Sequence, residues 1–98
     1  MIARHWRGLA QTDCADAYVE HLRTETFPGL SRIPGFVSVS LLRRNETRGV
    51  EFLVITQWES LDAIARFSGS DPELAVVPEY VTTLMVECDG RARHYEVI

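Results

Sequence analysis

The stretch VEFLVITQWES, residues 50–60, indicates more about the fold than any other part of the chain. Its residues Phe52 to Ile55 are all apolar, whereas a strand with one face in water alternates apolar and polar side chains. Successive side chains of a strand point to opposite faces, so Leu53 and Ile55 face away from Phe52 and Val54. Both faces of this strand are therefore predicted to be covered.

The rest of the chain places strand and helix patterns on either side of this stretch. Mixed apolar and long polar residues favour a strand near each terminus, and apolar residues at helical spacing favour a helix before and after the central strands. Residues 45–49, NETRG, predict a hairpin loop. The predicted order is strand, helix, strand, strand, helix, strand, over residues 2–9, 11–27, 36–42, 50–58, 61–67 and 91–98.

Capping and proline signals mark the helix boundaries. The Thr-Asp pair at 12–13 can accept hydrogen bonds from the free N–H groups of the first helix, and the Pro-Gly pair at 28–29 is expected to end it. Ser60 is expected to cap the second helix. Because proline is common at the first position of a helix, residues 71–72 and 78–79 predict two further helix starts.

This order is that of the ferredoxin-like βαββαβ plan, an α+β fold in which one four-stranded antiparallel sheet carries both helices on the same side. The chain of 98 residues is predicted to form a single domain over residues 1–98. Two helices cover only one face of the sheet, and monomers seldom leave a continuous apolar face in water. We therefore expect a second copy to cover the open face, so that two sheets close into a barrel and the protein is a homodimer.

Composition and charge argue against several classes of partner. The formal net charge is −4, whereas nucleic-acid binding requires a basic surface. No apolar run approaches the roughly 20 residues that span a bilayer, and the first residues, MIARHWRG, lack the apolar stretch of a secretory signal. The histidines form no His-x-His or His-x-x-x-His pair, and Cys14 and Cys88 form no Cys-x-x-Cys pair. We expect a cytoplasmic protein with reduced thiols, no metal site and no membrane association.

Three segments that together span most of the chain resemble the antibiotic biosynthesis monooxygenase (ABM) family: IPGFVSVSLLRR at 33–44, EFLVITQWESLDAIARF at 51–67 and RHYEVI at 93–98. The resemblance implies a dimeric α+β barrel with a pocket between sheet and helices in each subunit. Several members oxidise polycyclic phenols to quinones with O₂ and without a metal or flavin. Others degrade haem, isomerise small metabolites or have no known activity. The resemblance therefore favours a cofactor-independent monooxygenase that acts on an aromatic or apolar small metabolite.

Oxygenation without a cofactor makes definite demands on such a pocket. The substrate must lose a proton to become an electron-rich phenolate or enolate that reduces O₂, so the site needs a base, an apolar slot and exclusion of water. A pocket on the order of a few hundred Å³ that receives a His and a Tyr or Trp is expected. The candidate residues are His94 and His5, to take or orient a proton, and Trp58, Tyr18, Phe67, Tyr80 and Trp6, to shape or close the slot.

Several positions depart from the patterns of characterised branches of the family. Quinone-forming relatives have an Asn four residues before the Trp that matches Trp58, and this chain has Val54 there. Haem-degrading relatives have a Trp on the second helix and a His ten residues later, where this chain has Phe67 and Val77. The strand-one Asn of that branch is also missing. These departures disfavour haem degradation and leave open a non-catalytic ligand-binding or structural homodimer whose aromatic side chains are all core.

Overall fold

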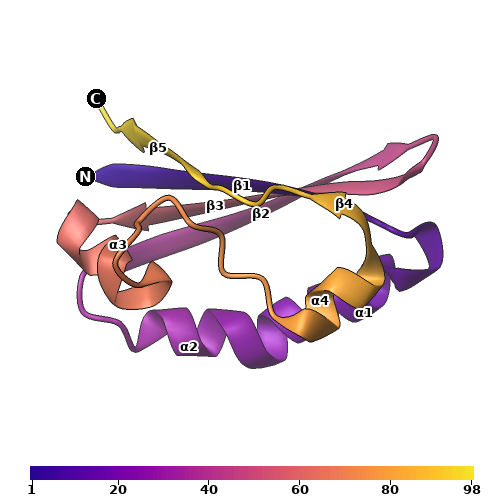
Figure 1. Ribbon diagram of the computed structural model, residues 1–98, viewed down its shortest axis with the longest axis horizontal. Coiled ribbons are helices and arrows are strands. Elements are labelled where there is room, and N and C mark those ends of the chain that lie inside the picture. The colour runs from indigo at the N-terminus through magenta and orange to yellow at the C-terminus, as the bar shows by residue number, and fades with distance from the viewer.

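One antiparallel sheet forms the frame of the molecule (Figure 1). The computed structural model describes all 98 residues, and the strands lie in the order β2-β3-β1-β4, with β5 also paired to β1. The strands are β1 (Ile2–Ala10), β2 (Phe36–Glu46), β3 (Gly49–Trp58), β4 (Met85–Cys88) and β5 (Arg93–Glu96).

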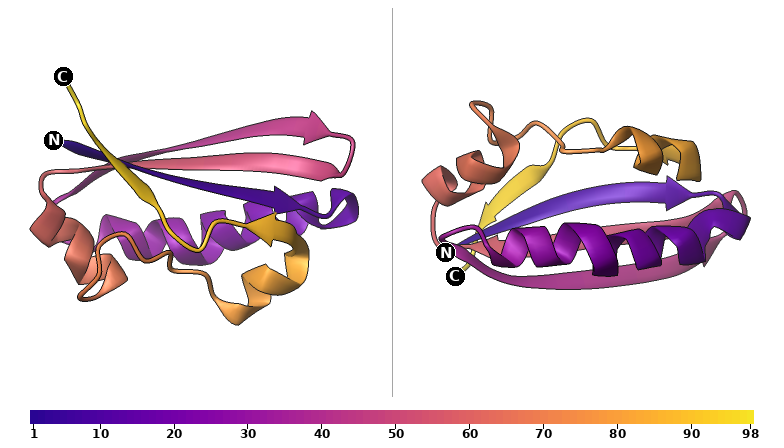
Figure 2. Two further views of the ribbon diagram at one scale, coloured as in Figure 1. Left: turned by 45° about the horizontal axis from the view of Figure 1, so that its top comes forward. Right: turned by 90° about the horizontal axis from the view of Figure 1, so that it is seen from below.

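The helices all lie on one side of this sheet (Figures 1 and 2). Three of them, α1, η2 and α2, follow one another without a break and form one long helix, while α3 and α4 lie beside it. The ferredoxin-like α+β fold predicted from the sequence is thus confirmed. The helices are η1 (Thr12–Cys14), α1 (Ala15–His21), η2 (Leu22–Thr26), α2 (Phe27–Ser31), α3 (Leu61–Ser68) and α4 (Glu79–Leu84).

The long first helix continues beyond its predicted end, because the Pro-Gly pair at 28–29 does not stop it. The segment η2 is a turn of π-helix, and Pro28 lies in the first turn of α2, directly after that turn. Inside a continuous helix, proline removes one backbone N–H and crowds the carbonyl one turn earlier, and the π-helical turn directly before Pro28 coincides with this break in the regular bonding. The helix ends at Ser31, and the N–H of Arg32 donates to the carbonyl of Gly29 over 3.3 Å.

The last strand of the ferredoxin-like plan is divided in two. β4 pairs with β1 at Gly8 to Ala10, and β5 pairs with it at Ile2 to His5. Between them the N–H of Asp89 donates to the carbonyl of Arg7 over 2.9 Å. The sequence predicted only the later segment, over 91–98, because β4 follows directly on α4 with no turn residues to mark its start.

Two local predictions differ from the structure, the length of the hairpin loop and the helix start at 71–72. The hairpin strands extend further than expected, so residues 47–48 alone form the turn that was predicted over 45–49. The Asp-Pro pair at 71–72 begins no helix. Asp71 Oδ1 instead accepts a hydrogen bond from the N–H of Glu73 over 3.0 Å, and such a bond to the backbone two residues on stabilises a turn.

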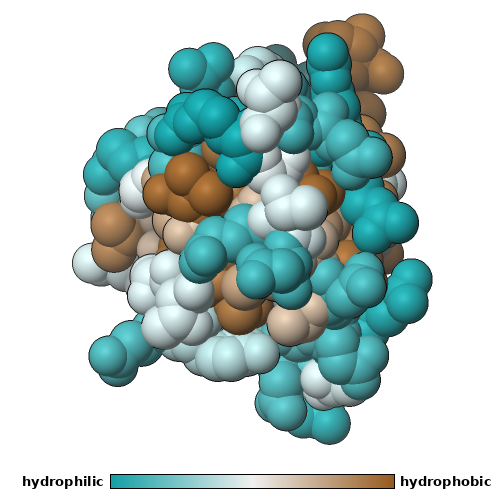
Figure 3. Space-filling model, turned by 90° about the vertical axis from the view of Figure 1, so that its right-hand side faces the viewer, coloured by the Kyte–Doolittle hydropathy of each residue, from teal (hydrophilic) through white to brown (hydrophobic).

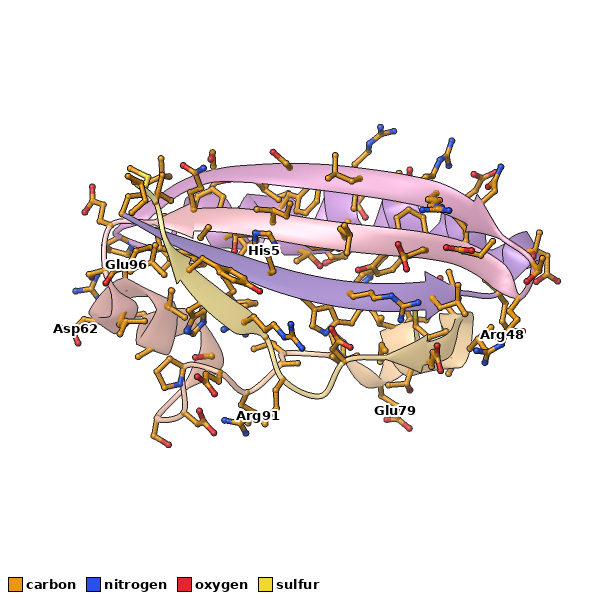
Figure 4. All side chains as sticks on the ribbon, turned by 90° about the horizontal axis from the view of Figure 1, so that it is seen from above. His5, Arg48, Asp62, Glu79, Arg91 and Glu96 are labelled. Atoms are coloured by element: carbon orange, nitrogen blue, oxygen red, sulfur yellow. The ribbon has the colours of Figure 1, made fainter.

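The two faces of the sheet differ in what covers them. Phe52, Val54 and Thr56 share one face, as predicted, and this face carries the helices, with Phe52 fully buried in the main core. Leu53 and Ile55 point to the other face, which carries no helix, and they remain half-buried (Figure 4 views this open face). The cavity described below therefore lies on the helix side.

The end of the molecule that carries the β2–β3 hairpin has a mixed surface. In Figure 3 apolar side chains appear there in separate patches among hydrophilic ones.

Cys14 and Cys88 are free thiols. None of the helices has the length and apolar character that crossing a bilayer requires.

Candidate functional site

A cavity of about 70 Å³ lies between the sheet and the helices. Its walls come from β1, β3, the long first helix, α3 and residues 76–81, and most of them are apolar. Arg4 is the one charged residue among them, and Thr26, Thr56 and the hydroxyl of Tyr18 are the other polar groups. The cavity is thus an apolar space with a single buried cation.

Aromatic rings occupy much of the space beside this cavity, which makes it smaller than the few hundred Å³ expected. Tyr18 meets Phe52 edge to face, with ring centroids 4.9 Å apart, and its ring centroid lies 6.4 Å from that of Trp6. The indole of Trp6 folds back over Gly8, where an added Cβ would lie 2.6 Å from the ring. Because Gly8 has no side chain, the Trp6 indole can occupy this space.

A wider groove of about 960 Å³ adjoins the cavity along the long helix. Both are lined by Thr26, Leu30, Phe67, Val76 and Pro78, so these side chains form the boundary between them. The segment between α3 and α4 contributes part of this boundary and contains no helix and no regular strand. A ligand larger than the cavity would therefore extend into the groove across this boundary.

Arg4 reaches from β1 to two other parts of the chain. Its side chain is only 5% exposed. Its Nη1 donates to the carbonyl of Pro72 and lies 3.0 Å from His94 Nε2, and its Nη2 donates to the carbonyl of Leu74 over 2.9 Å. Its guanidinium carbon lies 5.7 Å from the ring centroid of Phe67. Arg4 thereby holds the segment between α3 and α4 against the sheet.

Burial, together with the charge of Arg4 in the case of His94, sets the protonation of the groups around the cavity. Since a guanidinium only donates, His94 Nε2 must accept, which makes His94 the neutral tautomer with its proton on Nδ1. Burial lowers the pKa of His94, the charge of Arg4 lowers it further, and Glu73 opposes the shift. Burial also lowers the pKa of Arg4. Burial, and secondarily Cys88, raises the pKa of Tyr18, so this phenol stays protonated and can donate to a bound oxygen.

Trp58 is a core residue that stands behind the cavity and does not line it. It is fully buried, and its indole N–H donates to Thr56 Oγ1 over 2.8 Å. Phe36 packs edge-on against it, and Phe67 stacks on it with centroids 6.0 Å apart. Its effect on the cavity is indirect, because it orients Thr56 and supports Phe67.

The structure brings together some of the residues that the sequence singled out and separates others. Tyr18, Phe67 and Trp6 line the cavity. Tyr80 is 51% exposed and borders the groove. His94 is next to the cavity through its contact with Arg4, but it is not one of the lining residues.

His5 lies on the opposite face of the sheet from the cavity. It is labelled on the open face in Figure 4, and its ring packs edge-on against Tyr95 with centroids 4.9 Å apart. Successive residues of β1 point to opposite faces, so the residues on either side of His5, Arg4 and Trp6, line the cavity instead. None of the three histidines lines the cavity, whereas a histidine pointing into it was expected.

Arg4, Thr26 and Thr56 are the polar cavity residues that sequence reasoning missed. A signal for Arg4 was present: it stands two residues before Trp6, and so on the same face of the same strand. Thr56 shares a face with Val54 for the same reason. Val54, which replaces the Asn of quinone-forming relatives, lines the cavity and is paired in register with Trp6.

His21 borders the groove and has an unusual environment. Its Nε2 is buried and has no hydrogen-bond partner, and its ring centroid lies 5.4 Å from that of Tyr80. No group of three or more His, Cys, Asp and Glu side chains is arranged to hold a metal ion. His21 is therefore a groove residue without a metal-ligand set around it.

The chain is similar to known proteins in sequence and in fold. A family model described as antibiotic biosynthesis monooxygenase matches residues 1–79. Candidate antibiotic biosynthesis monooxygenases of similar fold come from Bacillus cereus (TM-score 0.67, 20% identity, covering 98% of this chain and 91% of that one) and Deinococcus radiodurans (TM-score 0.66, 17% identity, covering 99% and 92%). A MhuD variant with two manganese protoporphyrin IX molecules bound per active site is also similar (TM-score 0.57, 19% identity, covering 100% and 95%). No curated protein matches the chain.

Proposed function

The chain belongs to the antibiotic biosynthesis monooxygenase family, and we propose that it is a monooxygenase that uses O₂ to oxidise a small aromatic or apolar metabolite without a resident cofactor. The observation that supports this proposal is the cavity between sheet and helices, whose walls are apolar and aromatic except for a few polar groups. Such a site binds a flat apolar molecule and keeps water from the reacting atoms.

The proposed reaction needs no external reductant. A CH₂ group activated by a neighbouring phenol or enol loses a proton, and the resulting carbanion gives an electron to O₂. Recombination forms a C–O bond; one oxygen atom becomes a carbonyl and the other leaves as water, so CH₂ and O₂ yield C=O and H₂O. The protein has to accept the proton, orient the ring and exclude water.

His94 is the residue that we propose as the proton acceptor. It is neutral, since burial and the charge of Arg4 lower its pKa, and a neutral imidazole can take a proton near pH 7. Its acceptor nitrogen, Nε2, faces the Arg4 guanidinium, so His94 takes the proton only after this contact opens and the ring turns toward the cavity. Trp6, Tyr18 and Phe67 would hold the ring of the substrate, and Tyr80 would border its entry through the groove.

The test is O₂ uptake with a panel of anthrones and hydroquinones. His94→Gln should lower the rate by about a hundredfold or more, in the range that loss of a general base produces. His5→Gln should leave the rate close to that of the unmodified chain, because His5 lies on the other face of the sheet. Absence of uptake with the whole panel, or equal losses in the two variants, would count against the proposed role of His94 and the cavity.

A non-catalytic binding protein is the second candidate, and two observations favour it. The cavity of about 70 Å³ is small for a polycyclic substrate, and Val54 brings an apolar wall where quinone-forming relatives have an amide. This alternative predicts that the same aromatic compounds bind, as followed by quenching of tryptophan fluorescence, with no O₂ uptake. Binding together with uptake would rule it out.

A porphyrin does not fit the cavity. A macrocycle is far larger than the enclosed space, and no histidine is among the lining residues. Addition of haemin to the protein is therefore expected to give no shift of the Soret band. A saturable shift, abolished by His21→Ala, would instead place a haem in the groove beside His21.

A further inference from the structure

Arg4 has hydrogen-bonding capacity that the chain does not use. A guanidinium carries five N–H donors, and the contacts of Arg4 to Pro72, Leu74 and His94 use three of them. All three partners are neutral, two as main-chain carbonyls and one as an imidazole. The bonds therefore hold the side chain in place without balancing its charge.

No carboxylate balances this charge, although the chain has more acidic than basic residues. The formal net charge is −4, yet none of the ion pairs of the chain includes Arg4. Glu73 lies close enough to influence His94, but its carboxylate is paired with Arg91 over 3.3 Å. An unpaired buried charge is costly unless another group compensates it. The chain thus carries a buried cation, open to an apolar cavity, with no anion of its own.

We propose that Arg4 is an anion-binding group for the ligand of this cavity, and that the ligand is a small aromatic compound with a carboxylate or an ionised hydroxyl. The inference deepens the proposed function and rests on it, since it takes the cavity to be the substrate site. The anionic oxygen would bind the free donors of Arg4, which present a fixed and planar geometry for it. The hydroxyl of Tyr18, on the same cavity, can donate a further bond.

The position of Phe67 indicates where the ring of such a ligand lies. Phe67 is next to the Arg4 guanidinium and also belongs to the boundary between cavity and groove. If the anionic oxygen of the ligand binds Arg4, the attached ring lies beside Phe67, Val76 and Pro78, and the rest of the ligand extends toward the groove. This arrangement allows a ligand larger than the enclosed 70 Å³ to bind.

A consequence follows for the chemistry. A cation in an apolar site stabilises an oxyanion far more than water does, so a bound phenol should ionise at a lower pH than in solution. Arg4 would then share with His94 the work of forming the electron-rich anion. Neutral analogues of the same shape should bind much more weakly, because they leave the charge of Arg4 unbalanced.

The test compares an anion with a neutral molecule of the same shape. Benzoate and benzamide are titrated into the protein by calorimetry, and 4-nitrophenol is titrated at a pH where it is mostly neutral, with absorbance reporting its ionised form. Benzoate should bind at least about tenfold more tightly than benzamide, and binding should increase the ionised fraction of 4-nitrophenol. If binding increases the ionised fraction of 4-nitrophenol but benzoate binds no more tightly than benzamide, the ligand group is an ionised hydroxyl. If benzoate binds more tightly than benzamide but the ionised fraction of 4-nitrophenol does not change, the ligand group is a carboxylate.

Variants of Arg4 distinguish the effect of losing its charge from the effect of losing the fold. Arg4→Lys should retain the preference for the anion, and Arg4→Gln should lose it. Arg23→Gln is the matched control, because Arg23 is exposed on the long helix and makes no ion pair. Circular dichroism checks that each variant is folded, and the benzoate and benzamide comparison needs no variant at all.

Two results would overturn the inference. One is equal affinity of the unmodified protein for benzoate and benzamide with no change in 4-nitrophenol ionisation. The other is an anion preference that persists in folded Arg4→Gln. The proposed function is tested separately: O₂ uptake without anion preference would refute only the role of Arg4, and anion preference without O₂ uptake would refute only the oxygenase.

Discussion

Single side chains link parts of this molecule that are remote in the sequence. Arg4 is in the first strand, yet it binds the segment at 72–74 and the ring of His94 in the last strand. His94 in turn owes its neutral state to burial and to that neighbouring charge. Arg4 therefore connects the cavity wall, the segment at 72–74 and the last strand through hydrogen bonds.

The state of His94 predicts how stability changes with pH. Its pKa is lowered in the folded chain by burial, then by Arg4, so below about pH 6.5 an unfolded histidine gains a proton that folded His94 still excludes. The unfolded state then binds more protons, and the free energy of unfolding falls as the pH drops through this range. Urea unfolding at pH 7.5 and 5.5 should show a larger loss for the unmodified chain than for His94→Gln. Equal losses in the two proteins would contradict the role given to His94.

Two glycines predict opposite effects of the same substitution. Gly35 has φ +93°, and a Cβ there would lie 2.4 Å from Ala63 Cβ, so Gly35→Ala should destabilise the fold by about 1–3 kcal/mol. Gly29 lies inside α2 with open space where a Cβ would go. Gly29→Ala should therefore stabilise the chain by about 0.5–1 kcal/mol. Urea unfolding of both variants tests the pair, and a change of the same sign in both would refute it.

Secondary-structure elements follow their local signals where those signals are strong. Ser60 caps α3 as the sequence predicted: its Oγ accepts a hydrogen bond from the N–H of Ala63 over 3.1 Å. The helix start predicted at 78–79 is also present, with Pro78 as the N-cap of α4 one position before the predicted place of the proline. The π-helical turn η2 had no such signal, although it contributes Leu22 and Thr26 to the cavity wall.

The cap of α3 gives a prediction for that helix. Ser60→Ala should lower the free energy of unfolding by about 1 kcal/mol, because it leaves the N–H of Ala63 without its acceptor. Ser60→Asp should keep most of the stability, since aspartate also accepts at this position. Thermal unfolding compares the two variants with the unmodified chain. A Ser60→Ala variant as stable as the original would show that water replaces the hydroxyl at no cost.

As a whole, the molecule has one covered and one uncovered sheet face. The helices bury the first face around Phe52 and Trp58. On the other face Leu53 and Ile55 stay half-buried, and Leu42 is 49% exposed. We propose, as expected from the sequence, that a second copy of the chain covers this face in a homodimer.

This proposal predicts the size of the protein in solution. Sedimentation or light scattering at micromolar concentration should give the mass of two chains, and Leu53→Glu should give single chains or loss of folding because it puts a charge into the buried interface. Leu61→Glu is the control, since Leu61 is 48% exposed on α3, away from the sheet face. A folded single chain for the unmodified protein would disprove the dimer.

The amino-acid sequence was sufficient for the fold class and the family, and for the order of the elements apart from β4 and the helix start expected at 71–72. The apolar run at 52–55, the cap at Ser60 and the turn residues between elements are local signals, and hydrophobic periodicity shows which residues share a face. Tyr18, Phe67 and Trp6 line the cavity for this reason, since they lie on faces that the pattern turns toward the core.

Only the tertiary structure determined how distant residues meet. The Arg4–His94 contact joins residues 90 positions apart, and it depends on the register of β5 against β1. His5 lies on the opposite face for a different reason: it stands between Arg4 and Trp6 in β1, and successive side chains of a strand point to opposite faces. The volume of the cavity likewise depends on how Trp6, Tyr18 and Phe52 pack together. Such long-range packing leaves no local pattern in the sequence. Strand alternation could place Arg4 on the same face as Trp6, but only the folded chain shows the carbonyls and the histidine that hold it there.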